Sequence, residues 1–182
     1  TMEAMMLDGR ALQMGTSHNL GQNFAKGFEI KYLDKDGVQK YVWQTSWGVS
    51  TRMIGGIIMV HGDDRGLKLP PKVAPIQCRI VPIAAHKPGV MEKADELFHQ
   101  LKEAGIRVDL DDREQSAGWK FNECELRGIP VRLEIGPKDI ENGKAVLVRR
   151  DTFEKIPVAL DQIVQEVQNL LEAIHVNMLQ MA

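Results

Sequence analysis

The chain has 182 residues, of which 43% are hydrophobic and 26% charged, an ordinary composition for a folded globular protein. This length allows one large domain or two small ones. A net charge of −2 and a pI of about 6.2 argue against a generally basic nucleic-acid binder but are compatible with a local basic site. Two cysteines, Cys78 and Cys124, are too few for a disulfide framework or a zinc site by themselves, so a reduced, cytoplasmic protein is expected.

The N-terminal residues, TMEAMMLDGR, lack the basic and apolar regions of a secretory signal. The longest apolar run, MIGGIIMV, is too short to cross a bilayer, so we expect no membrane partner. The chain opens in mid-pattern without an initiator residue. We therefore expect it to be a piece of a longer protein.

The segment GRALQMGTSHNLGQNF (9–24) is dense in small and polar residues. It can be interpreted as the lining of a polar pocket, where Gly15 and Gly21 permit close backbone approach, or as an ordinary polar loop. Without acidic or metal-binding partners it indicates no particular chemistry. The residues with polar side chains that could line such a pocket are Gln13, Thr16, Ser17, His18, Asn19 and Gln22.

A β-hairpin and a helix are predicted next. Apolar residues alternate in KGFEIKYLDKDGVQKYVWQTSWGV (26–49) around a strong turn signal, Asp36-Gly37. Ser50 and Thr51 are expected to cap a helix that starts near Arg52. Arg52 is then either a first-turn residue reaching for solvent or a guanidinium that waits for an anion at the helix N-terminus.

The proline-rich segment LPPKVAP (69–75) favours extended backbone and predicts a linker. A strand at 76–85, a helix at 89–105 and a strand at 106–112 follow, so these two strands should be parallel. The remaining predictions are a helix over 117–127, a strand over 129–136, a turn over 138–144, a strand over 145–151, and a long amphipathic helix opened by Pro157. The predicted class is α/β, or α+β overall, with a mixed sheet flanked by helices.

The stretch GWKFNECELRGIPVRLEIGPKD (118–139) mixes aromatic residues with charges of both signs. Trp119 and Leu126 are expected to face the sheet. An aromatic ring can stack on a splayed base, a carboxylate can accept from a guanine's Watson–Crick edge, and an arginine can donate to its O6 and N7. The alternative is a solvated helix face with surface ion pairs. The candidate base-reading residues are Phe121, Glu125, Arg132 and Lys138.

No pair of histidines has the spacing of metal ligands, so no zinc or other metal site is predicted. Asp63 and Asp64 in HGDDRG are explained by an acidic turn that follows a helix.

Four stretches together resemble prolyl-tRNA synthetases of the eukaryote- and archaea-like type. These are GRALQMGTSHNLGQNF, QTSWGVSTRMIGGIIMVHGDDRGLKLPPKVAP, GWKFNECELRGIPVRLEIGPKD and VRRDTFEK, in that order and spacing. The STR and MVHGD stretch resembles class II motif 3, and the part after the prolines resembles a class IIa anticodon-binding domain. The resemblance implies the end of an antiparallel catalytic sheet with its motif 3 helix at 1–69, a linker at 70–75, an anticodon-binding α/β domain at 76–157, and a C-terminal helix at 158–182.

The resemblance also implies roles for individual residues. Arg52 matches the catalytic motif 3 arginine that contacts ATP, which the family uses with Mg²⁺ to make prolyl-adenylate before transferring proline to its tRNA. Four residues match positions that line the family's proline pocket: His18, Trp47, Gly48 and Ser50. Three more match positions near ATP and the tRNA's terminal adenosine: Gln13, Thr16 and Thr51. Residues that read the two guanines of a proline anticodon match Phe121, Glu125, Arg132 and Lys138.

The departures from the family pattern set limits. Nothing here matches motifs 1 and 2, and the cysteine-containing, often zinc-binding domain that usually ends this family is also missing. We therefore predict that the chain alone cannot form prolyl-adenylate. The resemblance also implies that the longer protein is a homodimer. Two alternatives are a tRNA-binding module without catalysis and a sister class IIa synthetase of the threonyl or histidyl type.

Overall fold

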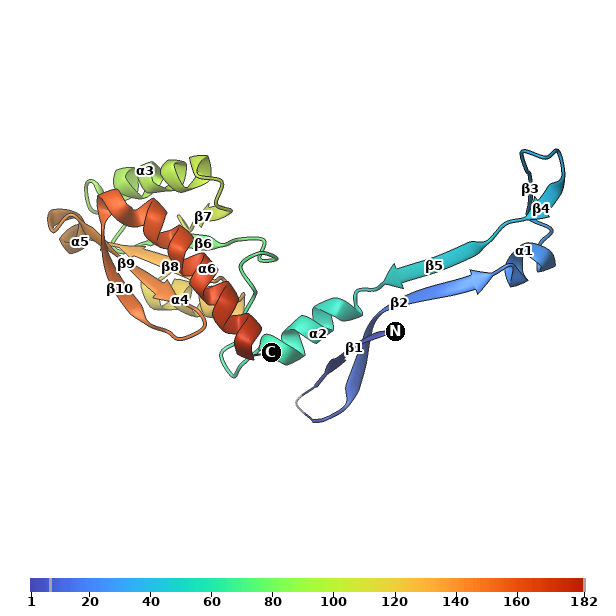
Figure 1. Ribbon diagram of the computed structural model, residues 1–182. Coiled ribbons are helices and arrows are strands. Elements are labelled where there is room, and N and C mark those ends of the chain that lie inside the picture. Colours follow the sequence, from blue (N-terminus) through green and yellow to red (C-terminus); the bar gives the residue numbers. More distant parts are fainter. Residues whose placement is uncertain (7, 182) are drawn as a thin grey trace. The chain divides into compact units, whose positions relative to one another are not determined.

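The computed structural model describes residues 1–6 and 8–181 of the chain (Figure 1). The chain forms two compact units, one from Thr1 to Val60 and a second that begins at His61. Each unit is described by itself.

The first unit is built on a three-stranded antiparallel sheet in the order β1-β2-β5. The predicted hairpin is confirmed as the pair β3–β4, whose turn holds Gly37 at a φ of 77°. The elements of this unit are β1 (Met2–Met5), β2 (Ala11–Gly21), α1 (Asn23–Gly27), β3 (Lys31–Leu33), β4 (Gln39–Tyr41), β5 (Gln44–Val49) and α2 (Arg52–His61).

The interpretation of residues 9–24 as an ordinary polar loop is wrong, because most of this segment is the long strand β2. Pairing with β5 provides hydrogen-bond partners for the backbone N–H and C=O groups of β2. The segment has few apolar side chains, so its sequence did not indicate a strand. Leu12 and Met14 lie against α2, where a Cβ on Gly56 would come within 2.5 Å of Met14 Cε. Gly56 therefore permits the close packing of α2 against β2.

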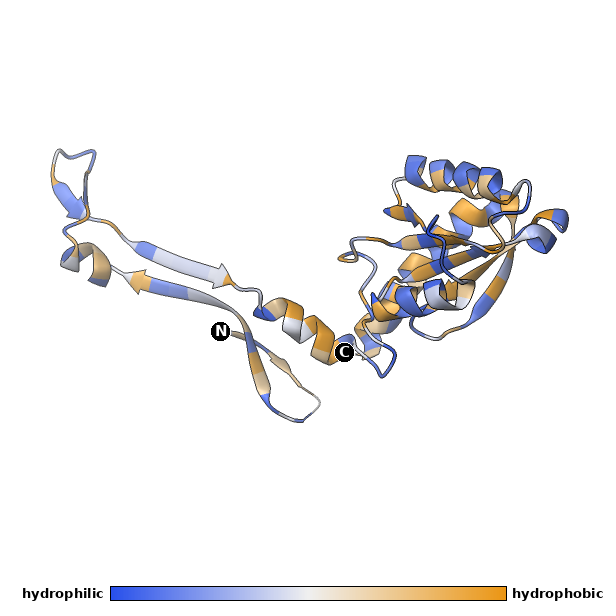
Figure 2. Cartoon of the chain, turned by 180° about the vertical axis from the view of Figure 1, so that it is seen from behind, coloured by the Kyte–Doolittle hydropathy of each residue, from blue (hydrophilic) through white to orange (hydrophobic). Residues whose placement is uncertain are grey.

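The described residues of the first unit form no apolar core of their own. Among the described residues up to 60, the buried ones are Gly15, Ala25 and Gly56, which are all small. Large side chains such as Phe28, Trp43 and Trp47 are exposed, and α2 is largely hydrophobic along its length (Figure 2). So much exposed apolar surface needs another surface to cover it.

The second unit contains a five-stranded mixed sheet in the order β10-β9-β8-β6-β7. As predicted, β6 and β7 are parallel, and β8 is parallel to β6 on its other side. The two remaining strands are antiparallel to their neighbours. The strands are β6 (Cys78–Pro82), β7 (Val108–Leu110), β8 (Val131–Ile135), β9 (Lys144–Arg149) and β10 (Lys155–Ala159).

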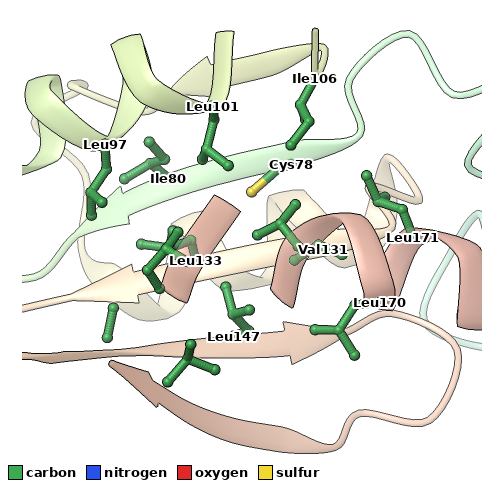
Figure 3. Packing of buried hydrophobic residues seen from close by; sticks show 14 of the residues in the cluster. Cys78, Ile80, Leu97, Leu101, Ile106, Val131, Leu133, Leu147, Leu170 and Leu171 are labelled. Atoms are coloured by element: carbon green, nitrogen blue, oxygen red, sulfur yellow. The ribbon is translucent and has the colours of Figure 1, made fainter. Parts of the chain in front are cut away.

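The two faces of this sheet differ in chemistry. One face carries the core, in which Ile80, Leu133 and Leu147 pack against Leu97 of α3 and Leu171 of α6 (Figure 3). The opposite face buries charged side chains, Arg79, Arg132 and Glu134, beside α4. The helices are α3 (Val90–Glu103), α4 (Ala117–Leu126), α5 (Pro137–Glu141) and α6 (Ile163–Met181), with a 3-10 turn η1 (Leu160–Gln162) before α6.

Three expectations for this unit are wrong in detail. Pro157 does not open a helix but lies in β10, where an edge strand tolerates its missing N–H, and the long helix begins at Ile163. The last residue of the expected helix, 182, lies outside the described residues. The predicted turn at 138–144 contains the short helix α5. Trp119 and Leu126 are 42% and 54% exposed, because α4 turns Lys120 and Cys124 inward instead.

The segment between α2 and β6 belongs to the second unit and packs against its other elements. Leu67 N donates to Leu126 O at 3.1 Å, and Leu69 N donates to Gly128 O at 3.2 Å. The Arg107 side chain donates to the carbonyls of Pro71 and Ala74 at 2.8 and 2.9 Å. This segment is therefore anchored along its length, and its role as a linker between domains stays a prediction.

Candidate nucleic-acid interface

A cavity of about 250 Å³ lies in the first unit, where β2 and β5 run beside the start of α2. It brings together five of the predicted residues, namely Gln13, Thr16, Gly48, Ser50 and Arg52; Met14, Gly15 and Val49 complete the lining. The volume is smaller than the roughly 300–1,000 Å³ of typical small-molecule pockets.

Arg52 is held at the edge of this cavity. Its backbone N–H donates to Ser50 Oγ at 3.3 Å, which confirms the predicted cap of α2. Its Nη1 donates to Gln13 Oε1 at 3.2 Å and to Gln13 O at 3.4 Å. A guanidinium beside a helix N-terminus favours an anionic ligand.

Six other predicted residues are not in the lining of this cavity, namely Ser17, His18, Asn19, Gln22, Trp47 and Thr51. Thr51 precedes α2, and Trp47 is 81% exposed. His18 pairs with Ser46 across the sheet and is exposed. Their assigned roles stay predictions.

The second candidate site is centred on the Glu125 carboxylate, at the C-terminal end of α4. Glu125 and Phe121 are four residues apart, which places them on one face of the helix. Glu125 Oε1 lies 3.4 Å from Arg132 Nη1, and Oε2 lies 3.3 Å from Arg65 Nη1. Its side chain is 17% exposed, so this carboxylate sits between two cations close to the surface.

Arg132 links Glu125 to the sheet. Its guanidinium lies 4.3 Å from the centroid of the Phe121 ring. Its Nε and Nη2 both lie 2.9 Å from Glu134 Oε1, and Nη1 also donates to the Phe121 carbonyl. Three of the four predicted base-reading residues therefore form one cluster.

The fourth, Lys138, lies elsewhere, in α5 beyond the far end of β8. Among the residues that the structure describes, no ion pair or cation–π contact joins it to Glu125, Arg132 or Phe121. Lys155 of β10 has this position instead: its Nζ is 5.9 Å from the Phe121 centroid and 3.5 Å from Glu134 Oε2. The sequence pattern did not indicate Lys155, and the role of Lys138 stays a prediction.

The inward side of α4 explains how the helix presents this cluster. Ser116 Oγ caps the helix by accepting from Trp119 N at 3.3 Å. Lys120 is buried and donates to the Asp111 carbonyl at 2.8 Å. Ion pairing with Arg113 lowers the pKa of Asp111, and burial raises the pKa of Cys124 to about 11. Cys124 is therefore an inert packing residue.

The cavity behind Glu125 has a volume of only about 10 Å³. That is room for about one water molecule and not for a base. A base that reaches Glu125 must therefore approach from solvent, where the Arg65 and Lys155 side chains are each 60% exposed.

In residues 1–6 and 8–181, no helix has the length and hydrophobicity to span a membrane. Within the same residues, no cluster of three or more His, Cys, Asp or Glu side chains is placed to hold a metal ion.

The residues that form this mixed sheet and most of its flanking helices match a known family in sequence. Residues 77–170 match the model of the family described as "Anticodon binding domain", and the chain belongs to that family.

Relatives similar along the chain carry one name. "Proline–tRNA ligase" of Symbiobacterium thermophilum is 62% identical over 180 residues, which cover 98% of this chain and 37% of that protein. The protein of the same name from Clostridium novyi is 58% identical over 182 residues, covering 100% of this chain and 38% of the relative. "Proline–tRNA ligase 2" of Bacillus cereus is 59% identical over 176 residues, with shares of 97% and 37%. The chain thus spans well under half the length of these relatives.

Proposed function

We propose that the longer protein is a proline–tRNA ligase, and that this chain supplies its anticodon-binding domain and the end of its catalytic domain. Such an enzyme activates L-proline with ATP to prolyl-adenylate and transfers proline to the 3′ end of proline tRNA. The observation that carries the proposal is the Glu125 cluster on a domain of the anticodon-binding family. The names of the relatives favour a ligase over the non-catalytic module and the sister synthetases.

In this proposal the first unit contributes to the ATP and proline sites. Arg52 stabilises negative charge on the nucleotide as pyrophosphate leaves. Gln13, Thr16 and Thr51 lie toward the nucleotide and the terminal adenosine. The proline pocket takes His18, Trp47, Gly48 and Ser50.

Mg²⁺ would accompany ATP in the reaction and screen its phosphates. The described residues that line the cavity beside Arg52 include no carboxylate, and carboxylates are the usual protein ligands of Mg²⁺. We therefore assign none of these lining residues to the metal.

The second unit reads the two guanines of a proline anticodon. Glu125 accepts hydrogen bonds from a guanine's Watson–Crick edge, and the Phe121 ring supplies a flat surface beside it. Arg132 holds Glu125 in place, and Lys155 or Lys138 adds positive charge toward the RNA. The proposal also includes a homodimeric longer protein in the cytoplasm.

Binding of RNA stem-loops tests this proposal. The 182-residue chain is titrated with a proline-anticodon stem-loop and with the same loop in which each guanine is changed, all at one salt concentration because phosphate contacts dominate raw affinity. We expect a loss of about 1–3 kcal/mol for a changed guanine. E125Q, which keeps the shape of the side chain, should remove that discrimination. Equal binding of all loops by the unsubstituted chain would refute anticodon reading.

A further inference from the structure

Glu125 has a second arginine that the family resemblance did not supply. Arg65 repeats the arrangement of Arg132: its guanidinium lies 4.4 Å from the centroid of a phenylalanine ring, Phe153, and its Nη1 donates to the other carboxylate oxygen of Glu125. The two arginines thus bracket the carboxylate, one oxygen each, and each lies over its own aromatic ring.

The turn that carries Arg65 is fixed in place. Asp63 Oδ1 accepts from Arg65 N at 2.9 Å, and Asp63 and Gly66 exchange backbone hydrogen bonds at 3.0 Å. Gly66 has a φ of +132°, and a Cβ there would lie 2.5 Å from Leu126 Cα. The turn can therefore press directly on the C-terminal end of α4, next to Glu125.

The ring beneath Arg65 is also held firmly. Phe153 adopts a φ of +60°, a left-handed conformation that is costly for a bulky side chain. Its N–H donates to Arg149 O at 3.0 Å, and the Arg150 guanidinium lies 5.2 Å from the ring centroid. A strained residue that keeps a ring under an exposed arginine is typical of a functional position.

Exposure separates the two arginines. The Arg132 side chain is 7% exposed and its three terminal nitrogens already face Glu134, Glu125 and the Phe121 carbonyl. The Arg65 side chain is 60% exposed. Arg65 is therefore the arginine with N–H groups open toward solvent, on the side from which a base must approach.

We propose that Arg65 is a further specificity-determining residue, which together with Glu125 reads the Watson–Crick edge of one anticodon guanine; this inference rests on the proposed function. The Glu125 carboxylate and the Arg65 guanidinium present two acceptors followed by a donor. A guanine presents the matching order, the N2 amino group, N1–H and the O6 acceptor. Adenine has a donor at position 6 and an acceptor at N1, so it does not match.

Base analogues isolate the atom that Arg65 contacts. In separate stem-loops, each anticodon guanine is replaced by inosine, which lacks the N2 amino group, or by 2-aminopurine, which lacks O6 and N1–H. We expect each replacement at the guanine read by this pair to weaken binding by the unsubstituted chain about tenfold. E125Q should remove the effect of inosine.

R65M is the decisive variant. It should weaken binding of the guanine loop by roughly tenfold, keep the inosine effect and reduce the 2-aminopurine effect. The matched control is R127M, because Arg127 is 59% exposed, lies at the end of α4, the helix that carries Glu125, and its substitution also removes one positive charge. Arg127 pairs with Glu123 and should leave both analogue effects unchanged.

Two results would overturn the role of Arg65. R65M could behave like R127M, or it could weaken guanine, inosine and 2-aminopurine loops by the same factor, which would make Arg65 a phosphate contact only. Failure of the proposed function looks different, because the unsubstituted chain would then bind all loops alike and E125Q would change nothing. Thermal unfolding of each variant checks that the fold is kept.

Discussion

Arg150 and Asp63 form a two-pronged ion pair across 87 residues of sequence, with Nη1 2.9 Å from Oδ2 and Nη2 2.7 Å from Oδ1. The Arg150 side chain is 3% exposed, and its Nε donates to the Glu125 carbonyl at 3.0 Å. One guanidinium therefore ties the turn that carries Arg65 to the helix that carries Glu125. The ion pair determines where the two proposed guanine-reading side chains lie relative to each other.

We predict that D63N lowers the free energy of unfolding by about 3 kcal/mol, because it leaves the buried Arg150 guanidinium without its carboxylate. D64N is the matched control, since the neighbouring Asp64 is exposed and loses the same charge. Urea unfolding followed by circular dichroism measures both variants. Equal midpoints for D63N and D64N would contradict the prediction.

The same ion pair predicts a dependence on pH. The Arg150 guanidinium holds the pKa of Asp63 well below its usual value of 3.8. Because the folded protein binds this proton less readily than the unfolded chain, the stabilisation is fully present above about pH 4 and is lost as the pH falls below it. The difference in unfolding free energy between the unsubstituted chain and D63N should therefore shrink from pH 4 downward. A constant difference through that range would count against the ion pair as its source.

Gly66 offers a test of how closely the turn approaches α4. G66A should destabilise the protein by at least about 2 kcal/mol, because a Cβ would meet the Leu126 backbone and the φ of +132° is strained for alanine. Gly143 is the control: it also has a positive φ, of +64°, but open space around it. G143A should cost about 1 kcal/mol from backbone strain alone. Similar unfolding midpoints for the two variants would show that the contact with Leu126 is unimportant.

Much of the fold could be predicted because its signals are local. The cap at Ser50, the turn at Asp36-Gly37 and the strand–helix–strand pattern after residue 76 each depend on a few neighbouring residues. The strand β2 was missed because its side chains are small or polar, and pairing with β1 and β5 stabilises it. Pro157 was wrongly expected to open a helix. A strand tolerates a proline when it lies at the edge of a sheet, and only the assembled sheet shows that β10 is an edge strand.

The site was predictable to the extent that it is contiguous in sequence. Phe121, Glu125 and Arg132 fall within one stretch and form one cluster. Arg65 lies 60 residues before Glu125 in the sequence, and Phe153 lies in the turn between β9 and β10. Neither residue is a sequence neighbour of the cluster, so the local pattern could not indicate that they contact it. Trp119 was misplaced because a buried ion pair, Lys120 with Asp111, determines which side of α4 faces inward.

The positions of Lys155 and Lys138 lead to opposite predictions. K155M should weaken binding of the proline-anticodon stem-loop several-fold, because Lys155 lies in the Phe121 cluster. The slope of the logarithm of the binding constant against the logarithm of the salt concentration should decrease in magnitude by about one. K138M should have little effect, since Lys138 lies in α5. Titrations at several salt concentrations measure both. Greater loss in K138M would favour the role that the family resemblance gave to Lys138.

The 182-residue chain should show no proline-dependent exchange of pyrophosphate into ATP. Among the residues that the structure describes, Arg52 is the single cationic side chain in the lining of a cavity of about 250 Å³, and Trp47 is 81% exposed. One guanidinium in an open cavity cannot enclose a triphosphate or exclude water, and both contribute to stabilising the charge that develops on pyrophosphate. The Clostridium novyi relative, assayed in parallel, is the positive control. Exchange by the 182-residue chain above the blank would show that its first unit is a complete active site.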